Sequence, residues 1–344
     1  MKAFLSFSEA RRRTVCEQAQ DTLGMPPATI EKDFWVCWTM KKLFDLPEWG
    51  GQLTFKGGTS LSKGWALIDR FSEDIDIVIN REALGFGGNM APDRAPSKKQ
   101  IRKRLDALKE ASQRCVKETL FPLLREAISQ EIPAELPWQL DLDLEDPDEQ
   151  TLLLAYPTAF ADQIIYLRQV VKIELGARSD IEPTQEINIH PYIVDVFPNL
   201  LNQAQFSVRA VSPERTFWEK AMLLHEETFR PLKKKRQARM ARHYYDLYRL
   251  IEAGIGEKAS GDIELFRRVS AHRQVYFRYT WVDYDTMCPG RLQLVPPDEQ
   301  LGDWKSDYTA MKDEMFLGEP PAFDDLIQIV QEFQDAFNRK ARAE

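Results

Sequence analysis

The sequence predicts a mixed α/β sheet with flanking helices, followed by a helical C-terminal domain. Residues 74–79 and 169–175 alternate apolar and polar side chains, as half-buried strands do. Gly57 and Gly58 join an apolar run at 53–55 to a segment with helical spacing, which indicates a strand, a glycine turn and a helix. Short strands around such a unit favour a mixed sheet over an all-β sandwich.

Two helices are expected before the glycine turn, at 7–23 and 29–45. Thr29 is a candidate N-cap, and Glu31 would lie in the first turn, where a carboxylate favours the helix dipole. The second helix carries large apolar side chains expected in the core: Phe34, Trp35, Trp38, Leu43 and Phe44.

After a loop at 85–97, we expect a long helix at 97–129, because Pro133 and Pro137 follow it. Four strands are then expected, at 138–145, 151–156, 166–176 and 187–197. Helices are expected at 213–229 and 239–254 and from about 322, the first with Ser212 as N-cap and Pro213 at its first position. We place the domain boundary between 205 and 206, with the predicted sheet and the N-terminal helices in residues 1–205 and the helical domain in 206–344.

The composition is that of a globular protein, with 43% hydrophobic and 29% charged residues. The net charge of −8 argues against a general nucleic-acid binder, so any such contact needs a local basic patch. Four scattered cysteines fit a reducing compartment and form neither a disulfide framework nor a zinc motif. The chain shows no signal peptide and no apolar run of ~20 residues, so we expect a cytoplasmic protein without a membrane span.

Two acidic residues two positions apart, Asp74 and Asp76, face the same side of the predicted strand. Their Cα atoms would lie roughly 6.5–7 Å apart. Like charges so placed repel each other unless a cation lies between them. Because hard divalent cations prefer oxygen ligands, the pair predicts one or two bound Mg²⁺ ions.

The glycine turn adds a phosphate site to this metal site. Gly57 and Gly58 allow close approach of the backbone, and the amides at a helix start point at an anion. Thr59 and Ser60 would add hydroxyl groups, and Ser72 would support the turn before the acidic pair. The combination predicts a site for a nucleoside triphosphate (NTP) with magnesium, rather than a surface turn beside a solvated acidic strand.

A third carboxylate could come from either of two strands. On 169–175, Lys172 and Glu174 share one face; if this strand neighbours the acidic pair, Glu174 would be a ligand and Lys172 would reach a phosphate. Asp195, among apolar neighbours, competes with Glu174 for this position. A rival acidic pair, Asp141 and Asp143, lacks a glycine turn and fits an exposed edge strand better.

The predicted C-terminal domain offers further charged candidates. Lys220 flanks the apolar face of its helix and either extends to solvent or points into a cleft. Asp246 fits an ion pair on the helix surface with Arg242 or Arg249. Seven cations form a run without an acid, which is either solvated or contacts phosphates of a nucleic acid: Arg230, Lys233, Lys234, Lys235, Arg236, Arg239 and Arg242.

Several motifs together resemble one protein family, the AbiEii/AbiGii-type nucleotidyltransferase toxins. The matching segments are Glu31-Lys32-Asp33-Phe34-Trp35, Phe55-Lys56-Gly57-Gly58-Thr59-Ser60-Leu61-Ser62-Lys63, Arg70-Phe71-Ser72-Glu73-Asp74-Ile75-Asp76, Val171-Lys172-Ile173-Glu174, Arg242-His243-Tyr244-Tyr245-Asp246-Leu247-Tyr248 and a C-terminal pattern from Asp307 to Phe323. The resemblance covers residues from about 29 to the end. One position departs from it: His243 stands where the family often has an acid.

The resemblance implies a polymerase-β-like nucleotidyltransferase domain and a helical C-terminal domain. It implies magnesium-dependent transfer of a nucleoside monophosphate from an NTP to an acceptor hydroxyl, for some members the 3′ end of tRNA, by a bacterial toxin of toxin–antitoxin or phage-abortive systems. Asp74 and Asp76, with Glu174 or Asp195, would hold metal, and Lys172, Lys220 and Asp246 would complete the catalytic and nucleotide-binding site. The acceptor RNA would contact Lys233 to Arg236, Arg239 and Arg242, and a cognate antitoxin is a candidate partner.

Three other functions fit the same residues. The acceptor could be a protein hydroxyl or a small molecule. The chain could bind nucleotides without catalysis, as an interaction protein. Lastly, its aromatic N-terminal helix and acidic surface could mainly bind a partner protein. The nucleotide and the acceptor both stay open from sequence.

Overall fold

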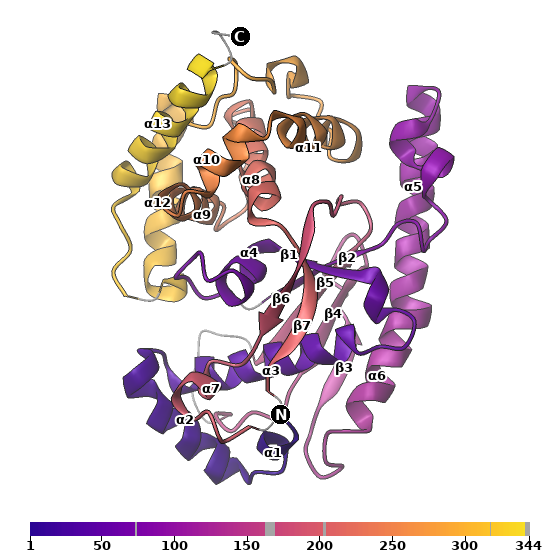
Figure 1. The fold of residues 1–344 in the computed structure, drawn as a ribbon, viewed down its shortest axis with the longest axis vertical. Helices are drawn as coiled ribbons and strands as arrows, with labels where there is room; N and C mark the ends of the chain where they lie inside the picture. Colours follow the sequence, from indigo (N-terminus) through magenta and orange to yellow (C-terminus); the bar gives the residue numbers. More distant parts are fainter. Residues whose placement is uncertain (73, 162–168, 202–203, 317, 341–344) are drawn as a thin grey trace. The chain divides into compact units, whose positions relative to one another are not determined.

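The computed structural model describes residues 1–72, 74–161, 169–201, 204–316 and 318–340 (Figure 1). The chain divides into two compact units. The N-terminal unit comprises residues 1–64 and 72–210, and the C-terminal unit comprises residues 65–71 and 211–344. A seven-residue segment of the early chain therefore packs with the late chain, which the sequence did not predict. The boundary at 205/206 stays a prediction.

A seven-stranded mixed sheet forms the centre of the N-terminal unit, in the order β3-β4-β5-β2-β1-β7-β6 (Figure 1). The strands are β1 (Leu53–Lys56), β2 (Ile75–Ile79), β3 (Gln139–Leu142), β4 (Thr151–Ala155), β5 (Val170–Gly176), β6 (Thr184–Ile189) and β7 (Phe206–Val211). β2 pairs antiparallel with β1 and parallel with β5. The predicted mixed α/β class is confirmed.

The predicted strands differ from the observed ones in two places. β7 was not predicted, and the expected strand at 187–197 ends at Ile189, after which a short helix begins. β3 lies at a sheet edge, as expected for the acidic pair at 141 and 143. The start of the strand predicted from 166 falls outside the described residues, which resume before β5.

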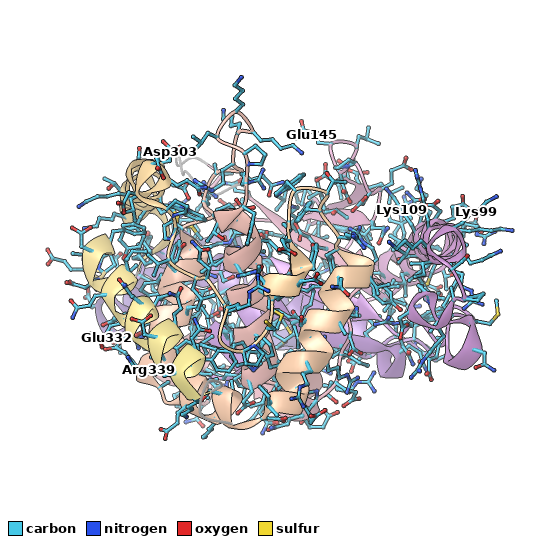
Figure 2. All side chains as sticks on the ribbon, turned by 90° about the horizontal axis from the view of Figure 1, so that it is seen from above. Lys99, Lys109, Glu145, Asp303, Glu332 and Arg339 are labelled. Carbon is cyan, nitrogen blue, oxygen red and sulfur yellow. The ribbon has the colours of Figure 1, made fainter. Side chains whose placement is uncertain are left out.

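The helices of this unit are α1 (Lys2–Leu5), α2 (Glu9–Leu23), α3 (Pro27–Phe44), α4 (Gly57–Thr59), α5 (Lys98–Arg114), α6 (Phe121–Ser129) and α7 (Ile193–Val196). A π-helical turn at 115–120 joins α5 to α6, so the two form one long rod in Figure 1. Figure 2 shows Lys99 projecting outward from α5, whereas Lys109 Nζ lies 2.7 Å from Asp148 Oδ1. This rod corresponds to the helix predicted at 97–129.

The helix α3 supplies much of the core, because Phe34, Trp35 and Trp38 are fully buried. Its start differs from the prediction. Pro26 is the N-cap and Pro27 the first helical residue, so Thr29 is not the cap. Glu31 lies beyond the first turn, contrary to the prediction; it is buried and accepts hydrogen bonds from Thr158 Oγ1 (2.7 Å) and the Ala159 amide (3.0 Å).

The C-terminal unit is helical, as predicted. Its helices are α8 (Pro213–Thr228), α9 (Arg242–Glu252), α10 (Ile255–Gly261), α11 (Ile263–Tyr276), α12 (Asp298–Met315) and α13 (Phe323–Lys340). Ser212 caps α8 by accepting from the Arg215 amide (3.2 Å). Glu332 and Arg339 project outward from α13 in Figure 2. No helix among the described parts of the chain is long and apolar enough to span a bilayer.

Candidate active site at the glycine turn

Two carboxylates meet on neighbouring parallel strands. Asp76 on β2 is the register partner of Glu174 on β5. Both strands bury their alternate apolar residues, among them Ile77 and Ile173, so the acids share the opposite face. Glu174 also forms an ion pair with Lys172, two residues before it on the same face. The conditional prediction that β5 neighbours the acidic strand is therefore met.

A lysine that the sequence did not single out belongs to this site. Lys56, at the end of β1, is the register partner of Asp76 on the side opposite to Glu174. Its ammonium group donates to the Ser179 hydroxyl (3.0 Å). The signal for Lys56 was available, because it directly precedes the glycine pair. The sequence analysis missed Lys56 because it did not predict that β1 pairs with β2.

The Asp76 carboxyl has a strongly shifted pKa. Its pKa is raised to about 7, mainly by burial; the charge of Lys56 lowers the pKa, and the charges of Glu174 and Asp74 raise it. For Lys172, burial lowers the pKa, but the hydrogen bond to Glu174 and the charges of nearby acids together outweigh burial, so that its pKa is raised. The carboxylates thus exceed the positive charge available to them, which is the condition that a divalent cation relieves.

Gly57 sits directly against the Asp76 carboxyl. Its φ is +82°, a backbone conformation that residues other than glycine rarely adopt. A Cβ atom on this residue would lie 2.0 Å from Asp76 Oδ2. The glycine is therefore required both by the backbone conformation and by the closeness of the acid. Gly58 follows within α4 and is half-buried.

The hydroxyl groups of the glycine turn make bonds within the turn. Thr59 Oγ1 donates to the Asp74 carbonyl (2.5 Å) and lies 2.8 Å from the Ser72 hydroxyl. Ser60 Oγ donates to the Gly57 carbonyl (2.9 Å). Both residues are fully buried. Thr59 and Ser72 thus fix the backbone before the acidic strand, as expected for Ser72, whereas Thr59 and Ser60 were expected to present their hydroxyls to phosphate.

The helix after the turn is shorter than predicted. α4 passes into a π-helical turn that ends at Gly64, and Ala66 has a φ of +51°. Trp65 and Ile68 therefore do not continue this helix, although their spacing suggested it. A buried ion pair between Lys63 and Asp33 (2.8 Å) ties the turn to α3.

Among the described residues, no group of three or more His, Cys, Asp or Glu side chains is arranged to hold a metal ion. The donor set at the turn nevertheless fits magnesium chemically. Asp76 and Glu174 are adjacent hard-oxygen donors with too little compensating charge, and Asp74 lies one residue before β2.

The rival third ligand lies elsewhere in the unit. Asp195 is on the short helix α7, not on a strand as predicted, and its side chain is 52% exposed. Its Oδ1 lies 2.9 Å from His190 Nε2. Glu174 is thus the alternative that the structure brings to Asp76.

Lys220 and Asp246 form a buried cluster in the C-terminal unit. Asp246 accepts two hydrogen bonds from Arg70 (2.7 and 2.8 Å) and lies 2.7 Å from Lys220 Nζ. Asp246 is fully buried, so the predicted surface pair with Arg242 or Arg249 is wrong. Arg249 pairs with Asp69 instead (2.7 Å). Arg70 was quoted in the family motif but had been given no role.

Electrostatics in this cluster favour an ionised Asp246. Burial opposes its charge, but Arg70 and Lys220 outweigh burial and lower its pKa below the ordinary range. Burial lowers the pKa of Lys220, and Arg70 adds to this effect, although Asp246 opposes it. Both pKa values are lowered, which favours the charged form of Asp246 but disfavours that of Lys220, because one carboxylate serves two cations. Arg70, which binds in a bidentate manner, is therefore the main partner of Asp246.

The basic run divides into two groups. Lys233, Lys234 and Lys235 are exposed. Arg236, in contrast, pairs with Glu227 (3.2 Å) and lies 3.8 Å from the centre of the Trp304 ring. Arg239 accepts a hydrogen bond from Arg242 through its carbonyl (2.7 Å), and both arginines are half-buried.

The family model described as nucleotidyl transferase AbiEii toxin, type IV TA system, matches residues 38–339. The match covers the glycine turn, both acidic strands and the Arg70–Asp246–Lys220 cluster. The chain belongs to this family. It is accordingly a nucleotidyltransferase of the AbiEii toxin family, as the resemblance implied.

Two solved structures are similar to this AbiEii family member. One is JHP933 from Helicobacter pylori, at 15% identity and a TM-score of 0.40, covering 91% of this chain and 94% of that one. The other is the nucleotidyltransferase toxin MenT4 from Mycobacterium tuberculosis, at 13% identity and a TM-score of 0.41, covering 96% and 98%. The search of curated proteins gave no match.

Proposed function

We propose that this AbiEii-family enzyme transfers a nucleoside monophosphate from an NTP to the 3′-terminal hydroxyl of a tRNA, in a magnesium-dependent reaction that stops growth of the cell. The acceptor oxygen forms a bond to the α-phosphorus, the bond to the β-phosphate breaks, and pyrophosphate leaves. Such a reaction needs positioning and charge compensation more than covalent chemistry.

The turn residues would hold the nucleotide. Gly57 and Gly58 let the backbone approach the triphosphate, and Thr59, Ser60 and Ser72 hold that backbone in place. Lys172 would compensate phosphate charge. Lys220 and Asp246 act with Arg70 within their own unit, and we assign them a supporting role in nucleotide binding.

Asp74, Asp76 and Glu174 would hold the metal. When bound, Mg²⁺ lowers the pKa of the attacking hydroxyl and neutralises the charge that develops on pyrophosphate. The single observation that carries this proposal is the position of Asp76. It lies against Gly57 and in register with Glu174, and its pKa is raised to about 7, first by burial and then by the neighbouring acids.

RNA is the acceptor that the exposed lysines support best, because an acidic protein needs a local basic patch to bind a polyanion. Lys233 to Arg236, Arg239 and Arg242 are the proposed contacts. A type IV toxin family also implies an antitoxin as partner. We place the reaction in the cytoplasm, where NTPs and tRNA are available.

Labelled NTPs incubated with total RNA, a protein extract and a small-molecule fraction would test this function. We expect label at tRNA 3′ ends with the wild-type protein and Mg²⁺, and none with Asp76→Asn or with a chelator. Asp141→Asn, an acid on the edge strand, is the matched control and should retain transfer. Label in protein or small molecules alone would refute the proposed acceptor.

A further inference from the structure

An aromatic pair lies beside the exposed lysines of the C-terminal unit. The rings of Tyr279 and Trp281 are stacked, with centroids 4.4 Å apart and an angle of 20° between their planes. Tyr279 is 37% exposed, so part of its ring is accessible. Both residues lie in the segment after α11 and carry no role in the proposed transfer.

The basic run contacts this pair directly. Lys234 Nζ lies 3.7 Å from the centre of the Trp281 ring, and the Arg230 guanidinium lies 5.6 Å from it. Lys233 and Lys235 are exposed on either side of Lys234. We call Tyr279, Trp281 and the three lysines the aromatic–lysine surface.

This surface is held in place by buried polar bonds. The Tyr279 amide donates to the hydroxyl of Tyr284, which in turn donates to Glu226 (3.0 and 3.1 Å). Arg230 makes two hydrogen bonds of 2.6 Å to Glu227, and so anchors the start of the basic run to α8. A rigid ring costs little entropy when a ligand stacks on it.

Two exposed acids, Asp283 and Asp285, follow the rings in the sequence, against three exposed lysines. Glu227 is buried and neutralised by Arg230 and Arg236. Asp283, two residues after Trp281, accepts from the Asp285 amide (3.1 Å) in a local turn. The exposed groups beside the rings are therefore predominantly cationic, in a chain whose net charge is −8.

We propose that the aromatic–lysine surface binds unpaired nucleotides of the acceptor RNA, with a base stacked on Tyr279 and the lysines on the flanking phosphates. Proteins that bind single strands combine these two features, because every base has a π-face and every nucleotide carries a phosphate. A duplex hides its base faces, so this surface selects single-stranded segments. The inference deepens the proposed function and rests on its acceptor being RNA.

Binding measurements with the full-length chain test this surface independently of catalysis. The probe is a fluorescent RNA of about 12 nucleotides, similar to the site size of single-strand binding folds. Tyr279→Ala and Trp281→Ala should each weaken binding about tenfold without changing its salt dependence, as loss of one stacked base does. Tyr279→Phe keeps the ring and should bind like the wild type.

The lysines should behave differently from the rings. Lys233→Ala combined with Lys235→Ala should weaken binding and reduce the salt slope by about 1.4, or about 0.7 for each lost phosphate contact. Lys258→Ala, an exposed lysine on α10, is the control and should change neither quantity. Asp76→Asn should bind RNA normally, which separates this surface from the chemistry.

Several results would overturn the inference. The inference fails if an abasic strand of the same length, or duplex RNA, binds as tightly as the single-stranded probe. It also fails if Tyr279→Ala binds the probe as tightly as the wild type. Binding of an acidic polypeptide but no RNA would assign the surface to a protein partner instead. If single strands bind through Tyr279 but no RNA is ever labelled, the proposed acceptor fails and the surface stands. If Tyr279→Ala labels tRNA as the wild type does, the proposed surface fails and the proposed acceptor stands.

Discussion

Asp76 on β2 and Glu174 on β5 are register partners on adjacent parallel strands. Two carboxylates on one face of a sheet destabilise each other unless a cation is present. The pKa of Asp76, raised to about 7 first by burial and then by its neighbours, records this cost. Asp76 thus lowers the stability of the folded protein at the position where we propose catalysis.

Substitution of this acid should separate stability from activity. Asp76→Asn keeps the shape and removes the charge, so we expect an unfolding temperature equal to or above that of the wild type. Transfer should fall by two orders of magnitude or more, on the scale of removing one electrostatic stabiliser. Thermal unfolding and labelled-nucleotide transfer measure the two effects. A variant that unfolds early, or that keeps full activity, contradicts this role.

A substitution in the glycine turn should also separate an effect on stability from an effect on activity. Gly57→Ala and Gly24→Ala both force alanine into a positive φ, at a cost of about 1–2 kcal/mol. Nothing lies within 4 Å of the Cβ position at Gly24, whereas at Gly57 the new atom would meet Asp76 Oδ2 at 2.0 Å. Both variants should therefore lose stability in denaturant titrations. We expect transfer to be abolished by Gly57→Ala alone.

Removal of the buried carboxylate of the C-terminal unit should be costly. Asp246→Asn leaves Arg70 and Lys220 buried without their counter-charge, which costs about 3–5 kcal/mol. The matched control is Asp324→Asn, because Asp324 forms an exposed pair with Lys305 and should cost less than about 1 kcal/mol. Equal effects in urea unfolding would show that burial does not matter at Asp246.

A buried histidine should make the protein sensitive to acid. Burial lowers the pKa of His225 to about 4, and its Nδ1 accepts from the Gln293 amide (3.0 Å). The unfolded chain binds a proton near pH 6.5, while the folded chain resists it until about pH 4. Stability therefore falls as the pH falls through this window, by about 1.4 kcal/mol per pH unit.

His225→Gln should remove this part of the pH dependence in unfolding measurements between pH 4 and 6.5, while His272→Gln should leave it in place. His243 is buried too, and burial lowers its pKa as well, so some slope should remain. An unchanged slope in His225→Gln would assign the acid sensitivity to other groups.

The parts of the site that depend on local pattern could be predicted from sequence. Strict alternation placed Asp76 and Glu174 on the polar faces of their strands, and the glycine pair marked the turn. Pairing between distant segments could not be predicted, because a strand's period does not name its neighbour. For this reason the sequence analysis missed Lys56. It also kept Asp195 as an alternative to Glu174, because it predicted a strand where the structure has the helix α7.

The buried ion pairs were the hardest features to predict. Arg70 and Asp246 are 176 residues apart in sequence, and helix spacing suggested nearer partners for the aspartate. Charged residues are usually exposed, so the expectation of surface pairs was reasonable and wrong. Only the tertiary fold explains why both are desolvated together.

The segment at 65–71 leaves the first unit and packs with the second before the chain returns at Ser72. As a ribosome makes the protein, these residues emerge well over a hundred positions before their packing partners. The second unit therefore cannot complete itself from its own continuous stretch of sequence. A fragment starting at Val211 would lack Arg70, and one ending at Ala210 would carry Ile68 and Arg70 with nothing to cover them.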